Sequence, residues 1–286
     1  KANGRASTAM GSSTTASGEY STAMGAETIA IGQFSTAMGS TSEASGIAST
    51  AIGDQVDATG NHSTALGFYT TASGHSSTAL GFGSTASGKY GATALGSHTI
   101  ARGHTSTAIG NYTTAEDIYS FIIGVHNKTD ETPNPENFSF QNTAFVIGNG
   151  GHDSEGNYVG TSDTFSNAFE VLFDGTTTIA GDLNINSDAR LKANIISLGA
   201  TLSKLLQIDG KTYTMKKDAN HKKKIGLLAQ DIEKVFPELV TETNDIKSVN
   251  YQGLVPVLIN AMKEQQDEID SYKTELSNQR KEIDEL

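Results

Sequence analysis

The chain has 286 residues, with no cysteine, no tryptophan and only 7% aromatic residues. The absence of cysteine excludes disulfides, thiolate catalysis and cysteine-based zinc sites. Because so few large side chains cannot fill one large core, we expect burial in many thin layers or between subunits. The formal net charge is −12, and residues 116–186 carry one basic and eleven acidic groups, which argues against nucleic acid as a partner. No stretch approaches the roughly 18 apolar residues of a membrane span, so no membrane insertion is expected.

The first part of the chain, residues 1–115, is an internal repeat. Glycine recurs every seven residues from Gly4 to Gly88 and, after one step of eight, from Gly96 to Gly110, always with alanine two residues before it. The Ser-Thr-Ala-apolar segments favour strands of period two, and glycine accepts the backbone angles that turns demand. Glycine at this spacing excludes the long helices of a coiled coil. Because the first residues are already in phase with the repeat, we expect the chain to be a fragment of a longer protein.

The residue before each glycine alternates between two kinds, so the true unit is about fourteen residues, with two short strands and two glycine turns. In one kind this residue is mostly polar. In the other it is apolar, at Met10, Met24, Met38, Ile52, Leu66, Leu80, Leu95 and Ile109. Stacked units of this length predict a parallel β-solenoid that rises about 4.8 Å per coil. One apolar residue and one alanine per strand make too thin a core for a single roll, so we expect this apolar row to be buried between subunits.

The repeat units resemble those of a known family. A segment such as Ser-Thr-Ala-Met-Gly-Ser-Ser-Thr-Thr-Ala-Ser-Gly at 7–18 is similar to the head repeats of YadA-type trimeric autotransporter adhesins, and the resemblance covers about residues 1–115. It implies a head in which three left-handed parallel β-rolls form a trimer. It does not identify a ligand, because a fold does not determine a function.

Residues 116–186 are predicted to be an acidic, β-rich segment with a surface loop at 125–143. Part of this segment resembles the β-rich region that precedes the chaperone in many phage tail fibres. Its acidic side chains at Asp153, Glu155 and Asp163 lack the spacing of a calcium loop, so no metal is expected. Candidate receptor-contact surfaces are this loop and the roll residues Tyr20, Tyr69, His62 and His75.

A new composition starts at Ser187 and runs to the end of the chain. The apolar stretch 196–208 spaces its leucines like one face of a helix, and a second helix is expected from about Ala229 to Val235, stopped near Pro237. Four short motifs follow one another: Ser-Asp-Ala-Arg-Leu-Lys at 187–192, Gly-Leu-Leu-Ala-Gln at 226–230, Phe-Pro-Glu-Leu-Val at 236–240 and Val-Asn-Tyr at 249–251. In this order they resemble the intramolecular chaperone domain of phage endosialidase tailspikes, other phage fibres and the membrane-bound myelin regulatory factor, over residues 187–286.

That resemblance implies a domain that trimerises, helps the fibre ahead of it to fold and then cuts itself off with a serine/lysine dyad. Carried over to this sequence, Ser187 is the nucleophile, Lys192 is the general base, and the cleaved bond joins Asn186 to Ser187. Asp188 and Arg190 match the same motif and are expected to form an ion pair or to orient the dyad. A serine hydroxyl needs a neighbour that takes its proton, and a lysine does so only where desolvation lowers its pKa. The alternative for Ser187 and Lys192 is a helix N-cap and a solvated lysine.

The final helix, at about 255–286, has an apolar seam in steps of three and four residues. The seam consists of Val255, Leu258, Met262, Ile269, Tyr272, Leu276, Ile283 and Leu286, with Gln265 and Gln279 as polar layers. Such a pattern predicts a coiled coil, here a trimeric one.

The fold class predicted is therefore mainly β with a C-terminal α/β part: a trimeric β-roll head, a β-rich fibre segment and a chaperone that ends in a coiled coil. The function predicted is a homotrimeric fibre or adhesin on a phage virion tail or a bacterial cell surface. Its expected partners are its own copies and a cell-surface receptor, with a glycan as one candidate. No cofactor is expected, and no enzymatic activity beyond a single-turnover serine autoproteolysis. The alternative is a glycan-degrading phage tailspike enzyme, which needs paired carboxylates, with Glu131 and Glu136 as candidates.

Overall fold

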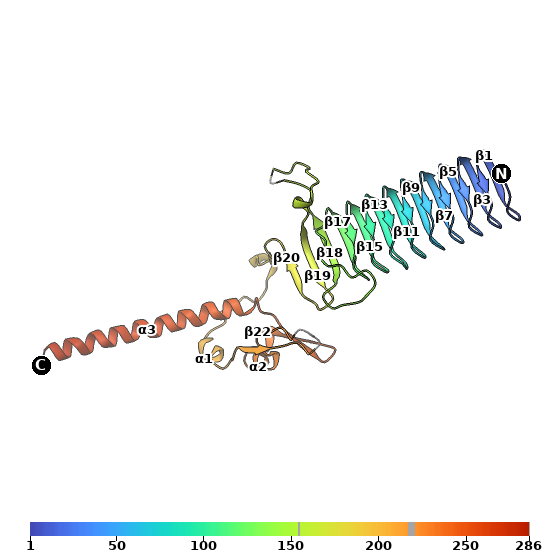
Figure 1. Ribbon diagram of the computed structural model, residues 1–286. Helices are drawn as coiled ribbons and strands as arrows, with labels where there is room; N and C mark the ends of the chain where they lie inside the picture. The colour runs from blue at the N-terminus through green and yellow to red at the C-terminus, as the bar shows by residue number, and fades with distance from the viewer. Residues whose placement is uncertain (154, 217–220, 286) are drawn as a thin grey trace. The chain divides into compact units, whose positions relative to one another are not determined.

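The structure, a computed structural model, describes residues 1–153, 155–216 and 221–285. The chain divides into two compact units, Lys1–Asn184 and Ile185–Leu286. The first unit is a long stack of parallel strands, and the second is a small α/β unit that ends in one long helix (Figure 1). Each unit is described by itself below.

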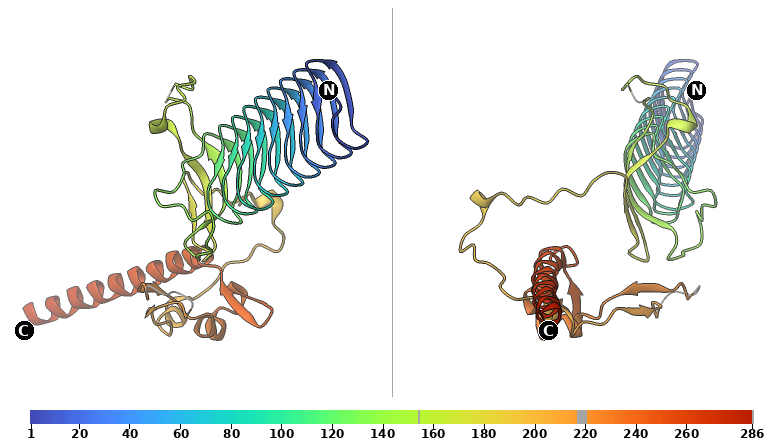
Figure 2. Two further views of the ribbon diagram at one scale, coloured as in Figure 1. Left: turned by 45° about the vertical axis from the view of Figure 1, so that its right-hand side comes forward. Right: turned by 90° about the vertical axis from the view of Figure 1, so that its left-hand side faces the viewer.

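The first unit is a β-roll of about eight turns, in which each coil contributes one long and one short strand. The long strands are β1 (Thr8–Ser12), β3 (Thr22–Ala26), β5 (Thr36–Ser40), β7 (Thr50–Asp54), β9 (Thr64–Phe68), β11 (Thr78–Phe82), β13 (Thr93–Ser97) and β15 (Thr107–Asn111). The short strands are β2 (Thr15–Ala16), β4 (Ile29–Ala30), β6 (Glu43–Ala44), β8 (Asp57–Ala58), β10 (Thr71–Ala72), β12 (Thr85–Ala86), β14 (Ile100–Ala101) and β16 (Thr114–Ala115). Long strands pair only with long strands and short with short, which makes the two faces of the roll visible in Figure 2.

Equivalent residues of successive coils lie directly beside one another. Ala23 pairs with Ala37 and Met24 with Met38, in parallel register fourteen residues apart. The predicted parallel β-solenoid with a fourteen-residue unit is therefore confirmed.

The interior of the roll contains alanine and small hydroxyl residues. The repeated alanines, such as Ala37, have no exposed surface, and the Ser or Thr just before each strand, such as Ser35 and Thr28, is buried as well. Because side chains alternate along a strand, an inward alanine turns the next residue outward. Met38 and its equivalents therefore lie on the outer face, half-buried or exposed. The interior is filled mainly by small residues, with Val56 as a larger member, and the apolar row lies outside it. Burial of this row between subunits stays a prediction.

The repeated glycines are required by close contact between coils. A Cβ built on Gly25 would lie 1.9 Å from the carbonyl oxygen of Gly39 in the next coil, and Gly32 meets its neighbour at the same 1.9 Å. The prediction that glycine accepts backbone angles unfavourable to other residues is confirmed for every second repeated glycine, such as Gly25 (φ 121°) and Gly39 (φ 113°). The left-handed position lies two residues after the glycine and holds other residues, such as Tyr20 (φ 56°) and Phe34 (φ 60°). Their side chains point away from the packed interior, so the larger residue fits there.

The sheet of long strands does not stop where the glycine repeat stops. It continues in parallel with β17 (Phe121–Val125) and β18 (Thr143–Asn149), and then antiparallel with β19 (Asn167–Leu172) and β20 (Thr177–Ile179). A short 3₁₀ helix, η1 (Ser162–Thr164), precedes β19.

The second unit contains short elements around a small core. They are η2 (Ala189–Leu191), α1 (Leu202–Leu205), β21 (Lys211–Tyr213), β22 (Lys224–Gly226), α2 (Ala229–Val235), η3 (Pro237–Leu239), β23 (Val240–Thr243), β24 (Ile246–Val249) and α3 (Leu254–Asp284). Ile232 and Phe236 of the α2 region pack with Leu254 and Val257 of α3 in one apolar cluster. The helix expected from Ala229 to Val235 is confirmed, with Pro237 opening the 3₁₀ turn that follows it.

The helix expected over 196–208 is much shorter in the structure, where α1 covers only Leu202–Leu205. Gly199 adopts a left-handed φ of 67°, which breaks a helix on its N-terminal side. The start of α1 is held by Glu264 of α3, whose carboxylate accepts hydrogen bonds from the backbone N–H of Thr201 at 2.5 Å and of Leu202 at 3.1 Å. These bonds keep the pKa of Glu264 below its usual range. The length of this helix therefore depends on the contact with Glu264, which lies about sixty residues away in the sequence and which no local pattern predicts.

Candidate functional site

The side chains of Ser187 and Lys192 lie against each other at the start of the second unit. Lys192 Nζ donates a hydrogen bond to Ser187 Oγ at 2.7 Å. Both residues are exposed in the single chain. The 3₁₀ turn η2 between them brings the two side chains to one side of the backbone. An amine at this distance could take the hydroxyl proton if it were neutral.

Asp188 and Arg190 form an ion pair inside the same turn. Arg190 Nη2 lies 2.6 Å from Asp188 Oδ2, and the backbone N–H of Arg190 donates to Asp188 Oδ1 at 2.8 Å. Asp188 is thus the residue that caps the turn. Hydrogen bonds from Arg190 keep the pKa of Asp188 below its usual range. The N-cap role considered for Ser187 therefore belongs to its neighbour, which leaves the Ser187 hydroxyl free to meet Lys192.

Two of the distant sequence motifs meet through Tyr251. Its hydroxyl accepts a hydrogen bond from the backbone N–H of Leu227 at 2.9 Å, and its ring lies beside Gly226, where an added Cβ would meet the hydroxyl at 2.9 Å. Motif order suggested that these segments belong together but did not reveal this contact. Tyr251 and Gly226 therefore hold the motif at 226–230 against the motif at 249–251.

The apolar seam of α3 faces solvent in the single chain. Leu258, Met262, Ile269, Leu276 and Ile283 are all exposed, with Met262 at 70%. Leu254, Val257 and Ala261 point the other way and are buried in the second unit. Leu286 lies outside the described residues. The helix therefore has two apolar faces along its first turns and one along its remainder.

The apolar row of the roll is also accessible. Met10, Ile52 and Leu80 are exposed, and the other members of the row (Met24, Met38, Leu66, Leu95 and Ile109) are half-buried. The row runs along the outer face of the long-strand sheet, parallel to the axis of the stack, because equivalent residues pair in register. A continuous apolar stripe of this kind is suited to contact with another chain.

An aromatic ladder follows one edge of the roll. Phe82 contacts His98, and His98 and Tyr112 stack at 4.5 Å. Tyr112 in turn stacks on His126 at 4.6 Å. His126 is fully buried, neither ring nitrogen has a hydrogen-bond partner, and burial lowers its pKa. Sequence reasoning missed this ladder, although His98, Tyr112 and His126 occupy the same left-handed turn position of successive coils.

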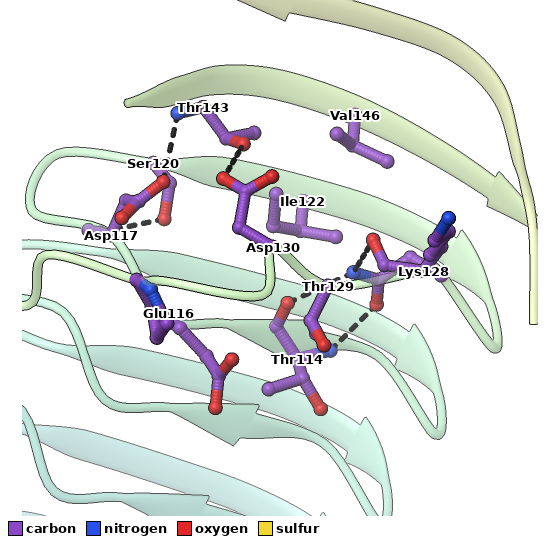
Figure 3. A pocket seen from close by; sticks show the side chains of 12 residues that line it. Thr114, Glu116, Asp117, Ser120, Ile122, Lys128, Thr129, Asp130, Thr143 and Val146 are labelled. Atoms are coloured by element: carbon purple, nitrogen blue, oxygen red, sulfur yellow. Dashed lines mark hydrogen bonds between the residues drawn. The ribbon is translucent and has the colours of Figure 1, made fainter. Parts of the chain in front are cut away.

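A pair of carboxyl groups holds the loop after β17 on the end of the roll (Figure 3). Asp117, which is buried, accepts hydrogen bonds from the backbone N–H of Asn134 at 2.6 Å and of Thr143 at 2.8 Å. Asp130 accepts the Thr143 hydroxyl at 2.9 Å, and burial together with the nearby Asp117 raises its pKa. These contacts place loop residues 133–136 beside the roll. Within the described ranges, no three His, Asp or Glu side chains are grouped closely enough to hold a metal ion.

Two family models match the chain. The model described as the YadA head domain repeat matches residues 2–28, 30–55, 58–84, 72–99, 87–113 and 101–121. The model described as the chaperone of endosialidase matches residues 187–241, which include Ser187, Lys192 and the motif at 236–240. Both resemblances expected from the sequence are confirmed, in the expected order.

The chain is also similar to curated proteins of bacteriophages. It is 33% identical over 122 residues to the long tail fiber protein Gp37 of Enterobacteria phage M1, which covers 38% of this chain and 49% of that protein. The Gp37 proteins of Enterobacteria phage Ox2 (32% over 120 residues; 37% and 48%) and Salmonella phage S16 (33% over 105 residues; 33% and 14%) are similar as well. The chain spans about half or less of these relatives. None of the helices described is long and apolar enough to cross a membrane. The chain thus joins YadA head repeats to a chaperone-of-endosialidase domain.

Proposed function

We propose that this chain is part of a homotrimeric phage tail fibre that binds a cell-surface receptor and is assembled by its C-terminal domain. The observation that carries the proposal is the order of the two family matches, an adhesin-type head followed by a fibre chaperone. Similarity to long tail fibre proteins of several phages supports a location on the virion tail. The proposed division is a roll at 1–115, a β-rich segment at 116–186 and a chaperone at 187–286.

Exposed apolar side chains support assembly into a homo-oligomer. In the second unit Ile196 is 88% exposed and Ile225 is 84% exposed, and the apolar members of the α3 seam from Val255 to Ile283 are accessible. Exposure on this scale marks surfaces that bind other proteins. A three-stranded coiled coil along α3 would bury the seam, with Gln265 and Gln279 as its polar layers.

Sedimentation equilibrium of the uncleaved chain, kept intact by Ser187→Ala, tests the trimer. We expect a mass three times the 30.0 kDa of a single chain, at concentrations from micromolar upward. A stable monomer or dimer across that range would contradict the proposal. Adsorption of the same preparation to a panel of enterobacterial cells tests receptor binding separately.

We also propose that the second unit cleaves the bond between Asn186 and Ser187. Ser187 Oγ attacks the carbonyl carbon of Asn186 while Lys192 Nζ takes the hydroxyl proton. The C–N bond then breaks, the Ser187 nitrogen gains a proton, and water hydrolyses the resulting ester. The 2.7 Å contact between the two side chains supports these roles. Because both side chains are exposed in one chain, the proposal includes their desolvation by neighbouring copies on assembly.

Mass spectrometry of the expressed chain tests the cleavage. We expect fragments that end at Asn186 and begin at Ser187, and only intact chain for Ser187→Ala and for Lys192→Met. Ser203→Ala, a serine of α1 in the same unit, is the control and should be cleaved like the wild type. Cleavage of Ser187→Ala at the same bond, or intact wild-type chain in the assembled state, would refute the dyad.

Nothing among the described residues favours the glycan-degrading alternative. Glu131 and Glu136 are both exposed loop residues. Glu136 borders an open groove in which, as far as the structure describes it, no second carboxylate lies. Glycoside hydrolysis by two carboxyl groups needs a facing pair.

A further inference from the structure

The charges of the roll are divided unevenly between its two halves. All five acidic residues of the repeat lie in its first half, at Glu19, Glu27, Glu43, Asp54 and Asp57. Residues 58–115 contain no Asp or Glu, although the whole chain has a net charge of −12. The same segment contains Lys89, Arg102 and four of the seven histidines. One half of the roll therefore has a basic and histidine-rich surface in an otherwise acidic protein.

The basic side chains of this half border one groove. The groove runs across three successive coils, has a volume of about 440 Å³, and is lined by His75, Lys89, Arg102 and His104, with loop residues Pro135 and Glu136 at its end. The loop is held there because the backbone N–H of His104 donates to the carbonyl oxygen of Pro135 at 2.9 Å. The groove is thus a defined feature built from the turns and the loop together.

An exposed aromatic ring adjoins the groove. Tyr90 is 52% exposed, lies between the rings of His75 (5.8 Å) and His104 (5.6 Å), and has Lys89 Nζ 5.7 Å from its centroid. Rows of aromatic and histidine rings present apolar faces with polar edges. Such surfaces pack against the C–H faces of sugar rings, and a neighbouring ammonium adds attraction for a negative group.

The charged groups in the groove favour an anionic ligand. Lys89 takes part in none of the ion pairs found among the described residues, whereas Arg102 forms an ion pair with Glu116 at 2.6 Å. His104 Nε2 has no hydrogen-bond partner, and Glu136 Oε1 lies 3.9 Å from it. Ammonium and guanidinium groups bind phosphate and carboxylate oxygens through charge-assisted hydrogen bonds. The groove therefore offers cationic donors whose partners are absent or replaceable.

A turn at the other end of the roll shows that this chemistry is not imposed by the fold. Tyr20 lies in the turn that follows Gly18, is 43% exposed, and has the Arg5 guanidinium 5.8 Å from its centroid. The residue before Tyr20 is Glu19, whereas the residue before Tyr90 is Lys89. The turn after Gly88 is one residue longer than the turn after Gly18 and carries the opposite charge, so the basic side chains of the groove come from the particular sequence of 58–115 and not from the repeat as such.

We propose that the groove beside Tyr90 binds an anionic glycan, a sugar chain with phosphate or carboxylate groups. Lys89 and Arg102 bind the anionic groups, and Tyr90 packs against a sugar ring. This inference rests on the proposed function of the chain as a receptor-binding fibre and assigns the receptor chemistry to one site. Phosphorylated bacterial core oligosaccharides and acidic capsular polysaccharides share this chemistry.

Calorimetric titration of the full chain tests the site with three probes: a phosphorylated core oligosaccharide, polysialic acid, which has carboxylates but no phosphate, and neutral dextran. We expect binding of at least one anionic probe, with an affinity at least about tenfold higher than for dextran, and weaker binding at higher salt. The anionic probe that binds identifies the source. Binding of neither anionic probe, or equal binding of dextran, overturns the proposal.

Matched variants locate the binding. Lys89→Ala and Tyr90→Ala should each weaken binding of the anionic probe by about fivefold or more, whereas Arg5→Ala and Tyr20→Ala at the equivalent turn should stay within about twofold. Equal effects of the two pairs overturn the site. If the wild-type chain is trimeric and adsorbs to enterobacterial cells while Tyr90→Ala adsorbs equally well, the proposed function stands and this site fails. A monomeric chain that adsorbs to no cells contradicts the proposed function itself.

Discussion

In the roll, each long strand turns an alanine inward and leaves its larger apolar residue outside, whereas the C-terminal unit divides its large apolar residues between a small core and solvent. The inward alanines, such as Ala37, have no exposed surface, while Ile196 and Ile225 are more than four-fifths exposed. In the roll every coil pairs with the next through backbone hydrogen bonds in unbroken register. The roll thus completes its interior within one chain, whereas the C-terminal unit leaves many large apolar side chains exposed.

This difference predicts which property of the protein a single substitution will change in each unit. A change inside the roll disturbs contacts between coils of the same chain. If α3 assembles as proposed, we expect a change on its exposed face to disturb assembly and to leave the chain's own core unaltered. The predictions below test this division, from the largest expected effect to the smallest.

Gly39→Ala should have the largest effect on the roll. Gly39 has φ 113°, and an added Cβ would lie 1.9 Å from the carbonyl oxygen of Gly53. Both the angle and the collision oppose a side chain, so we expect the free energy of unfolding to fall by more than about 4 kcal/mol. Gly210→Ala is the control, because an added Cβ there meets nothing within 4 Å. Chemical denaturation measures both, and equal stabilities would show that coils do not depend on close glycine contact.

Ile269→Asp and Leu276→Asp should disrupt assembly without unfolding either unit. Both side chains are exposed in the single chain, at 42% and 52%, and would be buried in a coiled coil. A buried, unpaired carboxylate costs several kcal/mol, so we expect the trimer to dissociate at concentrations about a thousandfold higher. Thr274→Asp, on the opposite side of the helix, is the control. Sedimentation velocity distinguishes the variants, and trimers that persist in both seam variants would place the interface elsewhere.

Adjacent residues of one strand should respond in opposite ways. Ala79 is fully buried and Leu80 is 42% exposed. Ala79→Leu overpacks the interior and should lower the melting temperature by an amount that corresponds to about 1–3 kcal/mol. Leu80→Ala should lower the free energy of unfolding of an isolated roll by less than about 1 kcal/mol. If the apolar row lies between subunits, the loss of stability should be larger and should depend on protein concentration. Thermal melts at several concentrations therefore test whether the row is an interface.

His126 should make the end of the roll sensitive to pH. Burial holds its pKa in the folded chain below its ordinary value of 6.5, and the nearby His152 lowers it further. The unfolded chain binds a proton at this residue before the folded chain does, so stability is full above about pH 6.5 and falls as the pH drops, by at most about 1.4 kcal/mol per pH unit until the folded pKa is reached. The ring contacts Tyr112, Tyr158 and Phe165.

His126→Phe keeps the ring stack and removes the titrating group. We expect its thermal stability to depend less on pH between about 7 and 5 than that of the wild type. His62→Phe, an exposed residue in the same kind of left-handed turn, is the matched control and should retain the wild-type profile. An unchanged profile in His126→Phe would assign the pH dependence to other groups, with the Asp117–Asp130 pair as the next to test.

The sequence by itself determined the elements whose signal is local. The seven-residue glycine spacing and the alternation before it predicted a β-solenoid with a fourteen-residue unit, and apolar spacing before Pro237 predicted α2. The repeat units were enough to identify the head, and motif order was enough to identify the chaperone domain. These features depend on residues a few positions apart, where backbone preference and periodicity act directly.

Only the tertiary structure decided which face of each strand lies inside and what the glycines do. The alanine is internal and the methionine external because small side chains allow the two sheets to approach, and glycine recurs because adjacent coils nearly touch. Contacts such as Glu264 with Thr201, or the groove between Lys89 and Glu136, join residues tens of positions apart. The spacing of residues in the sequence does not predict such contacts. They form only when the coils stack and when α3 packs against the segment around α1.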